Sequence, residues 1–164
     1  MEIRSACDTD IEAIKSLIDR NFDETISQYH SPEIVQKFKS HNSLESLKSQ
    51  LSWKKIYVAT EGEKVVGTGA FANFGTIDMP KYSISNLYVL PNLHGKKIGT
   101  KIVEVLLSEA KKANARTFHV PSTKNAIPFY QKHGFEVDTL QTDVEDEITW
   151  MTKPLQPPAN TGVL

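Results

Sequence analysis

The chain has 164 residues, a length that suits one domain around a single hydrophobic core. Its hydrophobic share of 39% and charged share of 24% are those of a soluble globular protein, which excludes a disordered or fibrous chain. A formal net charge of -1 gives no reason to expect a nucleic-acid partner, because such binding rests on clustered Lys and Arg.

The targeting and redox features of the sequence predict a cytoplasmic protein. No apolar run approaches the roughly 20 residues of a membrane-spanning helix, and Met1 to Arg4 lack the apolar region of a signal peptide. We therefore expect no membrane partner. Cys7 is the only cysteine, which excludes an internal disulfide, and we expect it to be a small buried structural side chain.

The N-terminal third predicts one strand followed by three helices. Residues 2–7 favour a strand, and an amphipathic helix follows the N-cap candidates of residues 8–10. Ser31-Pro32 is a second helix start signal, with Pro at the first helical position. Asn42-Ser43 is a third start signal.

The middle of the chain predicts a hairpin, a long strand and a long helix. Residues 55–60 and 64–71 are strand formers separated by a short loop with Gly62, which is typical of antiparallel neighbours. Residues 82–90 predict the next strand, which Pro91 ends. Residues 98–112 have the apolar pattern of a helix packed on a sheet.

The C-terminal part completes the predicted sheet. Residues 116–120, 135–137 and 148–151 predict strands, and a helix over 126–133 ends at Gly134, a residue suited to the left-handed C-terminal position. We expect one domain over residues 1–153. Residues 154–164, rich in Pro and polar residues, predict a flexible tail.

Residues 87–99 predict a strand, a glycine-bearing turn and a helix start in direct succession. The first turn of a helix has backbone N–H groups without internal partners and carries partial positive charge, so it can bind a phosphate. Gly95 removes the Cβ that would hinder close approach, while Lys96 and Lys97 add positive charge. The pattern favours an anionic ligand, although Gly95 and Gly99 could instead only shape the turn.

This turn resembles the acetyl-CoA motif of the GCN5-related N-acetyltransferase (GNAT) family, Gln/Arg-x-x-Gly-x-Gly/Ala. The matching register is His94, Lys97 and Gly99, with His94 in place of Arg or Gln and Lys97 in place of Gly. Lys97 can be tolerated if the position has a helical, negative φ, because contact through a backbone N–H does not depend on the side chain.

A second segment, residues 125–135, is similar to the family pattern Asn-x-x-Ala-x-x-Phe-Tyr-x-x-x-Gly-Phe. The resemblance implies that Tyr130 protonates the departing thiolate of CoA and that Asn125 and Thr123 contact the cofactor. A phenol with a reference pKa near 10 is protonated at neutral pH and can donate to a thiolate. For Phe129 and Phe135, core packing is expected whatever the function.

Together the two segments imply a GNAT-like α/β (α+β) fold. Its mixed, mostly antiparallel sheet would splay between the strands over 82–90 and 116–120, with helices on both faces. The resemblance implies acetyl-CoA as the acetyl donor, held by Leu87, Tyr88, Val89, His94, Gly95, Lys96, Lys97, Ile98, Gly99, Thr100, Thr123, Asn125 and Phe129.

The sequence does not determine which amine accepts the acetyl group. Segments 21–43 and 73–81 are expected to shape its pocket, and the strand over 82–89 has no carboxylate to act as the base that the family often places there. Asp78, Glu24 and His30 are the remaining candidates for that base, with solvated surface roles favoured for each. The histidines show no spacing typical of zinc sites, so we expect no metal.

The sequence therefore predicts an acetyl-CoA-dependent N-acetyltransferase that acetylates a primary amine of a small molecule or an exposed amine of a protein. The alternative is a non-catalytic acyl-CoA sensor or interaction module with the same fold. The resemblance also allows a homodimer, for which the chain carries no distinct signal.

Overall fold

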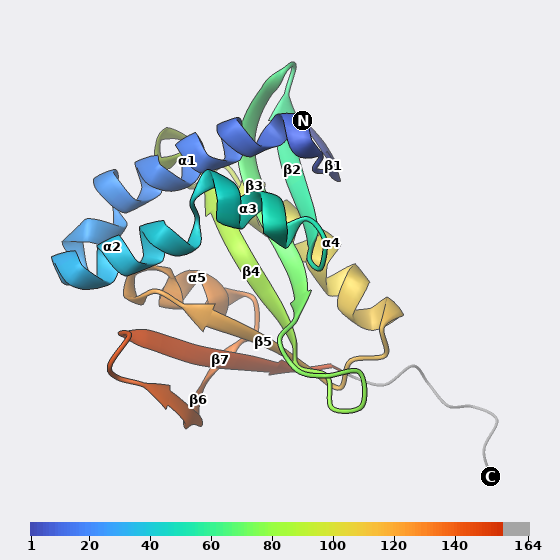
Figure 1. Ribbon diagram of the computed structural model, residues 1–164. Coiled ribbons are helices and arrows are strands. Elements are labelled where there is room, and N and C mark those ends of the chain that lie inside the picture. Colours follow the sequence, from blue (N-terminus) through green and yellow to red (C-terminus); the bar gives the residue numbers. More distant parts are fainter. Residues whose placement is uncertain (156–164) are drawn as a thin grey trace, which may run out of the picture.

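The computed structural model describes residues 1–155, whose seven strands form one mixed sheet in the order β1-β2-β3-β4-β5-β7-β6 (Figure 1). All neighbouring strands are antiparallel except β4 and β5. This topology confirms the predicted fold class. The strands are β1 (Glu2–Ser5), β2 (Lys55–Glu61), β3 (Lys64–Asn73), β4 (Tyr82–Val89), β5 (Thr117–Ser122), β6 (Glu136–Asp143) and β7 (Ile148–Pro154).

Five α-helices lie where the sequence predicts them, and α4 and α5 also end close to their predicted limits. Ser31 and Ser43 are N-caps, because their hydroxyl oxygens accept hydrogen bonds from the amides of Ile34 (3.4 Å) and Ser46 (3.1 Å). The helices are α1 (Ile11–Glu24), α2 (Pro32–His41), α3 (Leu44–Gln50), α4 (Ile98–Lys112) and α5 (Ile127–Lys132). Four short 3-10 turns join them: Asp8–Asp10, Ile26–Gln28, Pro91–Leu93 and Lys124–Ala126.

The helices bury both faces of the sheet. Helices α1, α2 and α3 cover one face and α4 lies on the other (Figure 1). Two apolar clusters correspond to these faces: Val58 and Ala70 pack with Phe22 on the first, whereas Ala59 packs with Leu106 on the second. Residues on both faces are buried because each strand alternates its side chains between them.

Strands β4 and β5 part soon after they meet. Their only aligned pair is Ser83 with His119, and the Ser83 hydroxyl donates to the His119 carbonyl over 3.0 Å. Beyond this pair β5 continues its ladder with β7 alone. The expected splay of the sheet is therefore present, and it leaves the C-terminal half of β4 without a strand partner on one side.

A β-bulge lies on β4 at this place. The register with β3 shifts between Thr68 and Ala70, and Asn86 adopts a left-handed conformation with φ 52°. Asn is among the residues that tolerate this region best. The bulge re-aims the side chains of Asn86 and its neighbours, as bulges near functional sites commonly do.

Two local expectations differ from the structure. Cys7 is exposed, so its predicted burial was wrong: the chain leaves the sheet there, and the Cys7 amide donates to Asp10 Oδ2 over 2.9 Å to begin a 3-10 turn. Pro154 belongs to β7 and Leu155 is buried, so the packed chain continues past residue 153. The rest of the predicted tail, residues 156–164, lies outside the described residues.

Two glycines of β3 let helix α4 approach the sheet closely. A Cβ on Gly69 would lie 2.5 Å from Ile102 Cγ2, and one on Gly67 would lie 3.0 Å from Ile102 Cδ1. Ile102 is fully buried, so it has little room to move.

We expect Gly69→Ala to lower the free energy of unfolding by about 1–3 kcal/mol through overpacking. Gly67→Ala is the matched control in the same strand and should cost less, because its clash involves the end of the Ile102 side chain. Urea unfolding of the two variants measures the difference, and equal losses would contradict this account of the packing.

Candidate active site

A cavity of about 390 Å³ lies where β4 separates from β5, between the N-terminus of α4 and helix α5. It brings together both segments that the sequence singled out. Every predicted site residue except Lys96 lines it: Leu87, Tyr88, Val89, His94, Gly95, Lys97, Ile98, Gly99, Thr100, Thr123, Asn125, Phe129 and Tyr130.

The N-terminus of α4 is suited to an anion. Its N-cap, Lys97, makes no side-chain capping bond, and its first turn has no acidic residue. The first intrahelical bond runs from the Lys101 amide to the Lys97 carbonyl, so the amides of residues 98–100 have no acceptor within the helix. These amides and the helix dipole favour a phosphate group.

The turn before α4 contains two residues with positive φ. Gly95 has φ 84°, and Lys97 has φ 66° with ψ 15°. The condition of a helical, negative φ at Lys97 is therefore not met. The position needs the left-handed conformation to enter the helix from this turn, which explains why a glycine suits it and why a lysine is strained there.

Helix α5 is fixed against this turn by packing and by one histidine. A Cβ on Gly99 would lie 3.2 Å from Phe129 Cζ, so a larger residue would displace that ring by a few tenths of an ångström from its present contact with α4. His133 Nδ1 donates to the Phe129 carbonyl over 2.8 Å, and the Thr100 hydroxyl lies 3.1 Å from His133 Nε2. The two sequence segments thus form one rigid corner, and sequence reasoning missed the part that His133 plays.

The end of β4 turns its backbone toward the cavity. The Leu90 amide donates to the Val66 carbonyl of β3, and successive residues of a strand direct their backbone groups to opposite sides, so the Val89 amide points into the gap. The Val89 carbonyl already accepts from Asn21 Nδ2 and His94 Nε2, each over 2.9 Å. His94 therefore contacts the strand rather than projecting toward the turn.

Asn125 has a buried side-chain oxygen without a hydrogen-bond donor among the described residues. Such buried acceptors are rare because they lose their water without compensation. Asn125 also lines the cavity beside Phe129, which brings this side chain to the wall of the predicted cofactor site.

Tyr130 lies at the junction of this cavity with a second one. The second cavity has a volume of about 730 Å³, and both cavities share Leu87, Tyr88, Thr123, Ala126 and Tyr130 as walls. Tyr130 is 5% exposed. Burial, and in smaller part the neighbouring Tyr88, raise the pKa of Tyr130 well above its usual range, which keeps the phenol protonated.

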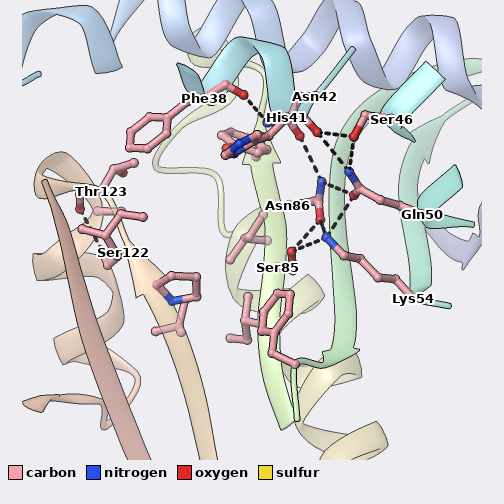
Figure 2. A pocket seen from close by; sticks show the side chains of 18 of the residues that line it. Phe38, His41, Asn42, Ser46, Gln50, Lys54, Ser85, Asn86, Ser122 and Thr123 are labelled. Carbon is pink, nitrogen blue, oxygen red and sulfur yellow. Dashed lines mark hydrogen bonds between the residues drawn. The ribbon is translucent and has the colours of Figure 1, made fainter. Parts of the chain in front are cut away.

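The second cavity has walls from α2, α3, β4 and β5 (Figure 2). Phe38 and Phe74 come from the two segments expected to shape an acceptor pocket, but α3 and Lys54 were not expected there. None of the three proposed bases lines it. His30 instead accepts a hydrogen bond from the Lys124 amide over 3.1 Å at Nε2, with Glu147 3.2 Å from Nδ1.

Within residues 1–155, no group of three or more His, Cys, Asp or Glu side chains is arranged to hold a metal ion. None of the described helices is long and apolar enough to cross a membrane.

The family of the chain follows from comparison with known proteins. A family model described as "Acetyltransferase (GNAT) domain" matches residues 26–153. The chain belongs to the GNAT family. GNAT enzymes use acetyl-CoA to acetylate amine acceptors, so this chain is an acetyl-CoA-dependent N-acetyltransferase. A search of curated proteins found no significant match.

Solved GNAT structures share the whole fold at low sequence identity. PaiA N-acetyltransferase from Thermoplasma acidophilum, in complex with coenzyme A, is 20% identical with a TM-score of 0.80 over 94% of this chain and 98% of that chain. A GCN5-related N-acetyltransferase from Rhodopseudomonas palustris is 21% identical with a TM-score of 0.79, covering 94% and 95%. A predicted acetyltransferase with acetyl-CoA from Clostridium acetobutylicum is 23% identical with a TM-score of 0.65, covering 87% and 94%.

The strain at Lys97 gives a test of the GNAT turn. Lys97→Gly should be more stable than Lys97→Ala by about 1 kcal/mol, because both variants remove the charge but only glycine relieves the left-handed conformation. Lys101, inside α4, is the control position, where Ala should be more stable than Gly by a similar amount. Urea unfolding measures the stability of all four variants. If Ala were more stable than Gly at both positions, the backbone at Lys97 would not be strained.

The unpaired oxygen of Asn125 gives a test of cofactor contact. Asn125→Leu should leave the stability of the free GNAT domain unchanged or raised, since its side-chain oxygen accepts no hydrogen bond from the described residues, while acetyl-CoA affinity falls about 10-fold. Asn42→Leu is the control for stability. The buried Asn42 side chain donates to the Phe38 carbonyl over 2.9 Å, so its loss should destabilise by roughly 1–3 kcal/mol.

Thermal unfolding and calorimetric titration with acetyl-CoA separate the two effects. A destabilised Asn125→Leu variant that binds acetyl-CoA like the wild type would rule out the assigned contact.

Proposed function

We propose that this GNAT enzyme transfers the acetyl group of acetyl-CoA to a primary amine of a small molecule by direct attack of the amine on the thioester. The observation that carries the proposal is the position of Tyr130, whose side chain lines both the cavity at the α4 N-terminus and the larger cavity beside it. A thioester bound in the first can meet an amine bound in the second at this residue. The larger cavity, about 730 Å³, has the size of a small-molecule site.

The cofactor would be held from three directions. The α4 amides and the positive end of the helix dipole would bind the pyrophosphate. The Val89 amide and the Asn125 oxygen would bind the amide groups of the pantetheine arm. These contacts position the thioester at the junction of the cavities, and positioning of two reactants is itself a large part of catalysis.

The reaction forms one bond and breaks one bond. The neutral amine nitrogen attacks the thioester carbonyl and forms the C–N bond, after which the tetrahedral intermediate loses the C–S bond. The nitrogen gives up one proton, and the departing sulfur takes one. The products are an N-acetyl amine and CoA thiol.

Tyr130 would donate the proton to sulfur. Its raised pKa keeps the hydroxyl protonated until sulfur gains negative charge. The same raised pKa makes the phenolate a short-lived species that regains its proton from water after the transfer. The nitrogen needs a proton acceptor as well, and the larger cavity offers His41 and Glu45 at its exposed side.

The proposed role of Tyr130 predicts a loss of turnover without a loss of cofactor. Tyr130→Phe should lower kcat roughly 100-fold, because general acid catalysis contributes on this order, while the acetyl-CoA dissociation constant stays within about 3-fold. Tyr82→Phe is the matched control, since Tyr82 also lies on the sheet but outside both cavities, and it should keep wild-type turnover.

Rates are measured as CoA release, corrected for acetyl-CoA hydrolysis, over a panel of amines. An unchanged kcat for Tyr130→Phe at every pH would refute the acid role. Tight acetyl-CoA binding by the wild-type protein with no turnover on any amine would instead favour the alternative, a sensor or interaction module of the same fold.

A further inference from the structure

One wall of the larger cavity is a connected set of polar side chains (Figure 2). It joins α2 and α3 to the bulge of β4. Asn86 Nδ2 donates to Asn42 Oδ1 and to Gln50 Oε1, each over 3.1 Å. The network consists of Asn42, Ser46, Gln50, Lys54, Ser85 and Asn86.

Lys54 is the only charged member of this network. Its ammonium group donates to Gln50 Oε1 (3.0 Å), Ser85 Oγ (2.9 Å) and Asn86 Oδ1 (2.9 Å). An ammonium has three N–H donors, whereas a neutral amine has two. The arrangement therefore accommodates the charged form of Lys54.

No carboxylate balances this charge. Among the ion pairs of the described residues none involves Lys54, whereas the adjacent Lys55 pairs with Glu109 over 2.9 Å. The remaining neighbours of the Lys54 nitrogen are the rings of Trp53 and Phe74, with centroids at 4.9 and 5.5 Å. Burial alone lowers the pKa of Lys54 to about 8, so the group is still a cation at neutral pH.

An uncompensated cation in a cavity wall attracts an anion. A carboxylate is a stronger acceptor than the neutral oxygens that now surround Lys54, because its full negative charge adds charge–charge attraction to the hydrogen bond. It can replace one of them without leaving the ammonium unpaired. A second cation in the same place would be repelled at low local dielectric.

We propose that the acceptor is a small amine that also carries a carboxylate, as amino acids do, and that Lys54 binds this carboxylate in the larger cavity. The inference rests on the proposed function, since it assumes that the larger cavity receives the acceptor. Figure 2 shows Lys54 on the wall opposite Thr123. Thr123 also lines the cofactor cavity, so the anion would lie on the far side of the acceptor from the reacting amine.

The test compares each acid with its own amide. The acceptors are glycine, β-alanine, γ-aminobutyrate and L-leucine, each paired with its carboxamide, and kcat/KM is measured for acetylation. The wild-type enzyme should prefer at least one carboxylate over its carboxamide by about 10-fold or more. The amine of a carboxamide is less basic and more of it is neutral, so amine reactivity alone would give the opposite order.

Three variants assign the preference to Lys54. Lys54→Gln removes the charge and keeps a donor for the network, so the carboxylate preference should fall to 1 or below, the order set by amine reactivity. Lys54→Arg keeps the charge and should retain a preference. Lys48→Gln is the matched control, because Lys48 is an exposed lysine of α3 outside the cavity. A wild-type preference for carboxamides, or a carboxylate preference that survives Lys54→Gln, would overturn the proposal.

A binding measurement separates this inference from the proposed function. Calorimetric titration of the same acids and amides into the protein with coenzyme A requires no turnover. Carboxylate binding that Lys54→Gln abolishes, without acetylation of any amine, would support the anion site and refute the transferase reaction. Acetylation restricted to amines without a carboxylate would support the reaction and refute the anion site, as would the absence of any carboxylate binding.

Discussion

The parting of β4 from β5 is the constraint on which the rest of the site depends. Parallel neighbours normally share a continuous ladder, but here they share one aligned pair, at Ser83. Backbone groups buried beside such a gap need other partners. The Val89 carbonyl receives two side-chain donors, Asn21 and His94, while its amide points into the opening. The Val89 carbonyl is therefore satisfied without a neighbouring strand on that side of β4.

The bulge at Asn86 connects the two sides of this cleft. Its left-handed backbone shifts β4 out of register with β3, so the strand after it follows a different course. Its side chain at the same time bonds Asn42, Gln50 and Lys54, which belong to the helical layer and the chain that follows it. One irregular residue thus shapes the strand that borders the smaller cavity and anchors the polar wall of the larger one.

Features that depend on local sequence could be predicted, and those that depend on distant contacts could not. Helix α4 over residues 98–112 and the N-caps Ser31 and Ser43 follow from apolar spacing and capping chemistry, and the splay followed from the resemblance to GNAT proteins. Lys54 was missed because an isolated lysine after a helix looks like any solvated lysine. The role of Lys54 appears only in the folded structure, where its partners are Ser85 and Asn86. These residues lie 31 and 32 positions further along the chain.

Lys97 and Cys7 show a second limit. A motif match at Lys97 gave the position but not its backbone conformation, because the positive φ comes from the way the turn joins the helix. Cys7 was assigned from the average burial of cysteine, whereas its place at the start of a 3-10 turn keeps it at the surface. In both cases the path of the backbone decided the outcome rather than the residue type.

The overall charge of -1 hides a local arrangement that favours anions. Lys96 and Lys97 directly precede the positive end of the α4 dipole, and Lys54 lies in the wall of the larger cavity. Acidic side chains near the β6–β7 turn are instead engaged by lysines, as Lys37 with Asp146 and Lys124 with Glu147. Because three neutral acceptors already surround Lys54, part of the gain from an arriving anion is offset by the hydrogen bond that it replaces. The net effect of Lys54 is a preference among acceptors, for carboxylates over carboxamides and against acceptors that would place a second cation there.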